Sequence, residues 1–117
     1  MTDIGAMLVR EIPPEQLLPT ATAVASHVDE LWIIEDLNWA GGVSQLGPIL
    51  EATNDDAHGR PVLGHGIAPA PFRNPAALAM EWATLARMYP GRIHGGIGRS
   101  GSATTACRWA CSCSVPR

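Results

Sequence analysis

The apolar residues of the chain form four short runs, separated by longer segments with helical spacing. The runs have strand length and cover residues 4–9, 31–34, 62–68 and 92–97. The second run, Leu31 to Ile34, is continuous rather than alternating, which is typical of a parallel strand covered on both faces. Strands that alternate with helices favour parallel pairing in sequential order with right-handed crossovers. The pattern therefore predicts an α/β fold with about four parallel strands and three helices.

The third predicted helix is the best delimited. The side chain of Asn74 can cap its start, and Pro75 suits the first helical position, where no backbone donor is missed. An apolar stripe follows at helical spacing. It predicts that Trp82 and Leu85 face the sheet and that Glu81 and Arg87 face solvent.

Two earlier segments predict shorter helices. One runs from residue 14 toward residue 26, and Pro19 either kinks it or begins it. The other covers residues 44–53, and the pair Gly47-Pro48 leaves open whether it is divided.

Composition narrows the class of protein. The chain has 117 residues, of which 46% are hydrophobic, and its net charge is −3. These values predict one small packed domain and argue against a nucleic-acid partner. No apolar run approaches the roughly 20 residues that span a bilayer. The start of the chain lacks the pattern of a signal peptide, so we expect a cytoplasmic location and no membrane partner.

The last residues differ from the rest. All three cysteines, Cys107, Cys111 and Cys113, lie there at a spacing that matches neither a disulfide framework nor a standard zinc site, so we predict no metal. The segment 99–117 contains no acidic residue and shows no periodicity. It is either a disordered tail or a segment translated out of frame. We therefore predict a domain over residues 1–98, followed by an irregular tail over residues 99–117.

Several motifs occur together in the second half of the chain. In order, they are Arg73 with Pro75 and Ala79, Thr84-Leu85, Gly91-Arg92, and Gly96-Ile97-Gly98. Their order and spacing resemble the luciferase-like monooxygenase family, and the resemblance covers roughly residues 3–98. It implies a (β/α)8 TIM barrel. Because such a barrel takes about 250 residues, the chain corresponds to its N-terminal half.

The resemblance implies catalytic residues at the end of the second strand. Glu35 and Asp36 stand at a carboxyl end, where parallel α/β folds assemble their sites. In relatives, acidic or polar residues at this place position the cofactor ring or the substrate. The alternative is that both are solvated acids of the loop.

The resemblance also implies residues that bind the cofactor. Deazaflavin-dependent relatives carry a strand bulge with a cis peptide, which backs the ring, at the position of Gly66, Ile67 and Ala68. A plain bend is the alternative. Gly96 and Gly98 would let the fourth strand approach the cofactor. His65, inside the third strand, is expected to be a packing residue, and Arg73 to form a surface ion pair or to contact substrate.

Two functions remain open at this point. The resemblance implies a flavin- or deazaflavin-dependent oxidoreductase or monooxygenase, with FMN or a deazaflavin as cofactor and a small molecule as substrate. The alternative is a catalytically silent half-barrel. Such a chain would pair with another chain, or form a homo-oligomer through the exposed edge of its sheet.

Overall fold

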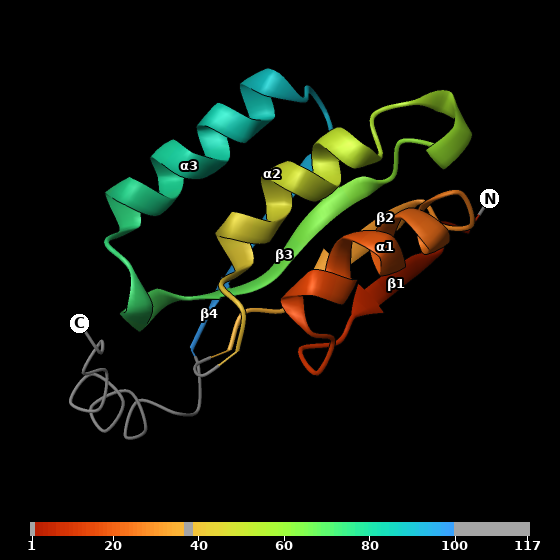
Figure 1. The fold of residues 1–117 in the computed structure, drawn as a ribbon. Coiled ribbons are helices and arrows are strands. Elements are labelled where there is room, and N and C mark those ends of the chain that lie inside the picture. The colour runs from red at the N-terminus through yellow and green to blue at the C-terminus, as the bar shows by residue number, and fades with distance from the viewer. Residues whose placement is uncertain (1, 37–38, 100–117) are drawn as a thin grey trace, which may run out of the picture.

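The computed structural model describes residues 2–36 and 39–99. Its centre is a single sheet in the order β1-β2-β3-β4, in which every neighbouring pair is parallel (Figure 1). The strands are β1 (Gly5–Leu8), β2 (Glu30–Ile33), β3 (Val62–Pro69) and β4 (Ile93–Gly98). Each begins and ends within one residue of the predicted strand. The predicted order and direction of the strands are confirmed.

Three helices connect the strands and lie on one side of the sheet (Figure 1): α1 (Pro14–Ala25), α2 (Gly42–Ala52) and α3 (Pro75–Met88). Two short 3-10 turns, Asp56–His58 and Ala70–Phe72, flank β3. Pro19 lies inside α1, and α2 runs undivided through Pro48, which answers both questions left open by the sequence. Helix α3 begins as predicted, because Asn74 Oδ1 accepts hydrogen bonds from the next backbone N–H groups, at 2.8 and 3.4 Å.

The core lies between the helices and the sheet face that they cover, here called the helix-covered face. Alternation along the strands places Leu31 and Leu63 in one row across this face, and Ile33 beside His65 in the next row. Helix α2 contributes its fully buried leucine and isoleucine side chains to the same core. Trp82 packs against it, as the apolar stripe predicts. The predicted orientation of α3 is confirmed, because Leu85 also packs against the core while Glu81 and Arg87 are exposed.

No described helix covers the opposite side of the sheet, here called the helix-free face, which carries Met7, Trp32 and Ile67. Met7 is 59% exposed and Ile67 40% exposed. The Trp32 ring lies over two glycines of β3: an added Cβ would stand 2.3 Å from this ring at Gly64 and 2.7 Å from it at Gly66. Four parallel strands with helices on one side are the arrangement of half a TIM barrel, and the helix-free face corresponds to the barrel interior.

A buried arginine joins the elements at the edge where β3 and β4 begin. Arg92 is 8% exposed. Its guanidinium donates to the Pro61 carbonyl at 2.9 and 3.1 Å, to the Leu50 carbonyl at 3.4 Å, to Thr53 Oγ1 at 2.9 Å and to Asn54 Oδ1 at 3.2 Å. The side chain thus satisfies oxygens at the C-terminal end of α2 and ties that end to the sheet. This contact gives the Gly91-Arg92 motif a structural role.

Two further expectations concern the chain as a whole. Among the helices of the described residues, none is long and apolar enough to cross a membrane. The predicted tail lies outside the described residues from position 100 onward, so the boundary after residue 98 stays a prediction.

Candidate functional site

The two acids that follow β2 lie at the carboxyl edge of the sheet but differ in their surroundings. Glu35 is two residues beyond Ile33, on the helix-covered side, and is only 7% exposed. Asp36 is half-buried and belongs to the loop between β2 and α2. The structure therefore does not bring the two carboxylates together as a pair.

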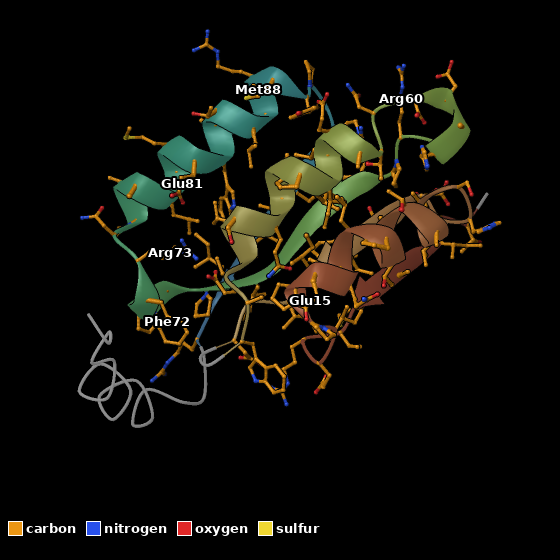
Figure 2. All side chains as sticks on the ribbon, in the orientation of Figure 1. Glu15, Arg60, Phe72, Arg73, Glu81 and Met88 are labelled. Atoms are coloured by element: carbon orange, nitrogen blue, oxygen red, sulfur yellow. The ribbon has the colours of Figure 1, made fainter. Side chains whose placement is uncertain are left out.

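Glu35 is held by a histidine and an arginine. His65 Nε2 lies 3.1 Å from Glu35 Oε2. Arg73 donates from Nε to the same oxygen at 3.3 Å and from Nη2 to Oε1. The remaining terminal nitrogen of the guanidinium, Nη1, approaches Glu81 Oε2, in the middle of α3, at 3.8 Å; Figure 2 labels both residues. The cluster therefore joins β2, β3 and α3 through one buried carboxylate.

His65 is fully buried within this cluster. The Trp82 indole donates to His65 Nδ1 at 3.3 Å, and the two rings meet edge to face with centroids 5.7 Å apart. Because an indole N–H can only donate, Nδ1 is an acceptor and the neutral ring carries its proton on Nε2. That proton is not aligned with Glu35 Oε2, so the 3.1 Å contact is not a well-formed hydrogen bond.

The first residue of α2 closes over the cluster. A Cβ added at Gly42 would stand 2.2 Å from His65 Nε2 and 3.0 Å from Glu35 Cβ. The close approach of this helix end therefore requires glycine.

The electrostatics favour an ionised Glu35. Burial acts to raise the pKa of its carboxyl group, but the contacts with His65 and Arg73 outweigh burial and lower the pKa to about 2. The group is a carboxylate at neutral pH, and its oxygens are already engaged by the guanidinium. Such a carboxylate is a weak proton acceptor. The catalytic role predicted for Glu35 stays a prediction, while its buried contacts are what the structure shows.

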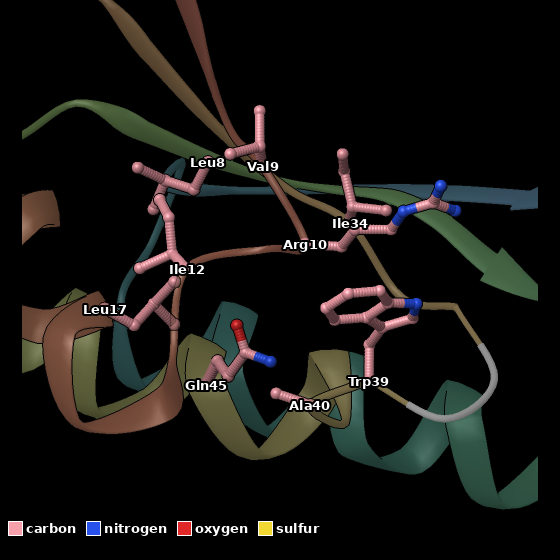
Figure 3. A pocket seen from close by; sticks show the side chains of 9 residues that line it. All are labelled: Leu8, Val9, Arg10, Ile12, Leu17, Ile34, Trp39, Ala40 and Gln45. Carbon is pink, nitrogen blue, oxygen red and sulfur yellow. The ribbon is translucent and has the colours of Figure 1, made fainter.

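Asp36 forms a separate, more exposed group with the loop after β1. Arg10 Nη1 donates to Asp36 Oδ2 at 2.6 Å, and the same guanidinium lies 5.6 Å from the centroid of the Trp39 ring. The hydrogen bond to Asp36, followed by the one to Glu11, raises the pKa of Arg10. Arg10 and Trp39 line a small pocket beside Val9, whose side chain points away from the helices (Figure 3). The catalytic role predicted for Asp36 also stays a prediction.

The end of β3 carries an irregularity where the sequence left two alternatives. The regular pairing with β4 ends where His65 faces Gly95, and it resumes where Ala68 faces Ile97. Strand β3 therefore bulges between these two pairs. The Gly66–Ile67 peptide is cis. The structure therefore has the bulge with a cis peptide rather than the plain bend.

The glycines near this bulge have packing roles within the chain. A Cβ at Gly98 would stand 2.2 Å from Ile67 Cδ1, and one at Gly96 would stand 3.4 Å from Ile67 Cγ2. The space above Gly66 is filled by Trp32. The side chain of Ile67 thus lies over β4 on the helix-free face. Cofactor binding by Gly66, Ile67, Ala68, Gly96 and Gly98 stays a prediction.

Sequence reasoning placed His65 in the core but did not connect it to Glu35. For Arg73 it left a surface ion pair or a contact with substrate open, whereas this side chain is only 26% exposed and pairs with a buried acid. A signal for this cluster was present. The alternation that puts Leu31 and Ile33 on the helix-covered face extends to Glu35, which predicts a buried acid in need of a cation.

Among residues 2–36 and 39–99, no group of three or more His, Cys, Asp and Glu side chains is arranged to hold a metal ion. The three cysteines of the sequence lie beyond these residues.

The comparison with protein families covers β2 to β4 and the Glu35 cluster, but not β1 or Arg10. The model of the luciferase-like monooxygenase family matches residues 25–108, which is more than half of the chain. The chain belongs to the luciferase-like monooxygenase family. The matched residues include Glu35, the β3 bulge and the glycines of β4, and the match continues beyond Gly98. A search of curated proteins found no match to the chain.

Proposed function

We propose that the chain forms one side of a flavin or deazaflavin site in an oxidoreductase that acts on a small molecule. The observation that carries this proposal is the bulge in β3. It lies at the carboxyl end of the strand and presents the exposed Ile67 on the helix-free face, which corresponds to the interior of the barrel. Sites of barrel enzymes assemble at this end.

The residues at this edge suit the ring of such a cofactor. A flat tricyclic ring requires apolar surface, and Ile67 and Val9 offer it with 40% and 47% of their surfaces exposed. The two arginines nearby are engaged, Arg10 by Asp36 and Arg73 by Glu35. The described residues therefore fit the ring part better than a phosphate.

The chemistry of a bound ring is supplied by the cofactor itself, as hydride transfer or as reaction with dioxygen. The part of this chain is to orient the ring and to exclude water from one of its faces. FMN and deazaflavins share the flat ring that the Ile67 surface would contact, so both cofactors are tested.

The test is a titration of the purified chain with FMN and, separately, with a deazaflavin, followed by fluorescence. We expect Ile67→Ser to weaken binding of at least one of them about tenfold, because the substitution removes apolar area that the ring would cover. Met88→Ser is the matched control. This residue is also an exposed apolar side chain, at 62%, but lies at the far end of α3 (Figure 2). Equal affinities of the Ile67→Ser and Met88→Ser variants, or no binding of either cofactor, would overturn the proposal.

A further inference from the structure

The segment that links β3 to α3 begins after one residue and ends at another that both contact the same carboxylate. His65, the last residue paired with β4 before the bulge, contacts Glu35 Oε2 at 3.1 Å. Arg73, which follows the 3-10 turn Ala70–Phe72, binds both carboxylate oxygens. Residues 66–72 lie between these two contacts. Glu35 thus joins the beginning and the end of the segment that carries Ile67.

We propose that Glu35 is a positioning residue: through His65 and Arg73 it fixes the β3 bulge and thereby sets the place of Ile67. The inference about the segment stands on the contacts alone. Its consequence for cofactor affinity rests on the function proposed above, in which Ile67 contacts the ring.

The middle of the segment has a support of its own, because Ala68 and Pro69 are buried and pair with Ile97 and Gly98 of β4. On either side of this pairing the support is weaker. The bulge takes residues 66 and 67 out of the regular ladder with β4, and the turn Ala70–Phe72 has no side-chain cap. The positions of these two stretches therefore depend on the ends of the segment as well as on the pairing of its middle.

The chemistry of the contact requires a carboxylate. The fork of a guanidinium matches two carboxylate oxygens, and charge-assisted hydrogen bonds of this kind are about twice as strong as neutral ones. Glu81 cannot replace Glu35, since it approaches only Nη1 of Arg73, at 3.8 Å, and is exposed. A glutamine at position 35 keeps the shape of the side chain but loses the charge and one acceptor.

The first measurement uses the chain without cofactor. We expect Glu35→Gln to speed hydrogen exchange at the amides of residues 66–72, other than Pro69 and Pro71, which have none, at least tenfold. We also expect it to shift the methyl resonances of Ile67, while β1 and β2 keep their protection. Glu51→Gln is the matched control. It makes the same chemical change in a carboxylate that also accepts a long-range hydrogen bond, from the Tyr89 hydroxyl at 2.7 Å, away from this segment.

A second variant tests the same contact in case Glu35→Gln does not fold. Arg73→Gln breaks the same contact from its more exposed partner, whose side chain is 26% accessible. It is expected to loosen the same residues. Unchanged exchange in residues 66–72, or a uniform increase over all four strands in both variants, would overturn the positioning role.

Titration with FMN and with a deazaflavin then separates the two proposals. If Glu35→Gln moves Ile67 but Ile67→Ser does not alter the binding of either cofactor, the positioning role stands and the proposed function fails. If binding depends on Ile67 but Glu35→Gln leaves both the segment and the affinities unchanged, the function stands and the positioning role fails.

Discussion

Two charged side chains are buried at opposite ends of the same sheet, and different kinds of partner stabilise them. Arg92, where β3 and β4 begin, is surrounded by carbonyl, amide and hydroxyl oxygens of fixed elements. Glu35, beyond the end of β2, is paired with a charged guanidinium and lies next to an imidazole whose proton is misaligned. At the Arg92 end the guanidinium has all its nitrogens in hydrogen bonds, while at the Glu35 end His65 Nε2 is a donor without a hydrogen-bond partner in the described part of the chain.

The difference agrees with the division of labour in parallel barrels, where the end at which strands begin serves stability and the opposite end serves chemistry. At the Arg92 end, one side chain completes the hydrogen bonding of a helix terminus. At the Glu35 end, His65 of β3 and Arg73, which precedes α3, contact one carboxylate beside the bulge. We therefore expect variants at the Arg92 end to lose mainly stability, and variants at the Glu35 end to change mainly the site beside the bulge.

The largest effect is expected at the stable end. Arg92→Ala leaves the buried Pro61 and Leu50 carbonyls without their donor, and each unsatisfied group costs about 1–3 kcal/mol. We expect the free energy of unfolding to fall by about 3 kcal/mol, as measured by urea denaturation. Arg87→Ala, at an exposed arginine of α3, should change it by no more than about 0.5 kcal/mol. Similar losses in the two variants would show that the Arg92 contacts contribute little.

A smaller effect is expected where α2 meets the Glu35 cluster. In Gly42→Ala the new methyl group would stand 2.2 Å from His65 Nε2, so the imidazole must shift, and we expect a loss of about 1–3 kcal/mol. Gly47→Ala, in the same helix, meets Leu85 Cδ2 at 3.9 Å apart from its chain neighbours, but it precedes Pro48, whose ring disfavours a Cβ there, so we expect a change of no more than about 0.5 kcal/mol. Thermal unfolding of both variants measures the difference. A stabilising Gly42→Ala would mean that the cluster is looser than the structure shows.

The smallest effect is a pH dependence at the Glu35 end. The pKa of Glu35 is lowered from 4.5 to about 2 in the folded chain, so its contribution to stability is present above about pH 4.5 and is lost as the pH falls toward 2. Glu35→Gln should cost about 1–2 kcal/mol at neutral pH. The difference between wild type and variant should shrink over this acid range in urea denaturation series. A difference that stays constant down to pH 2 would contradict the charged contact.

The sequence predicted the frame of the fold more fully than the site. Strand limits and the cap at Asn74 follow from local patterns, since hydrophobic runs, turn residues and capping chemistry act over a few positions. The partners of Glu35 do not follow from such patterns. Arg73 lies 38 positions further along the chain, and its contact depends on how α3 packs against the sheet. Alternation could identify the buried face of Glu35, but it could not identify the cation that binds it.

The glycines show the same limit. The sequence suggested that Gly66, Gly96 and Gly98 leave backbone accessible to a cofactor, because glycine permits close approach. In the structure, their neighbouring space is taken by Trp32, Ile67 and the His65 carbonyl of the chain itself. A glycine indicates that something lies close to the backbone, but not which group it is.

The packing of Trp32 over Gly64 also constrains how this sequence can change over time. A methyl group at position 64 would stand 2.3 Å from the indole, so Gly64→Ala is unfavourable while the tryptophan is present. Once position 32 carries a smaller side chain, the same substitution fills vacated space and becomes favourable. The two substitutions are therefore accessible in one order and not in the other.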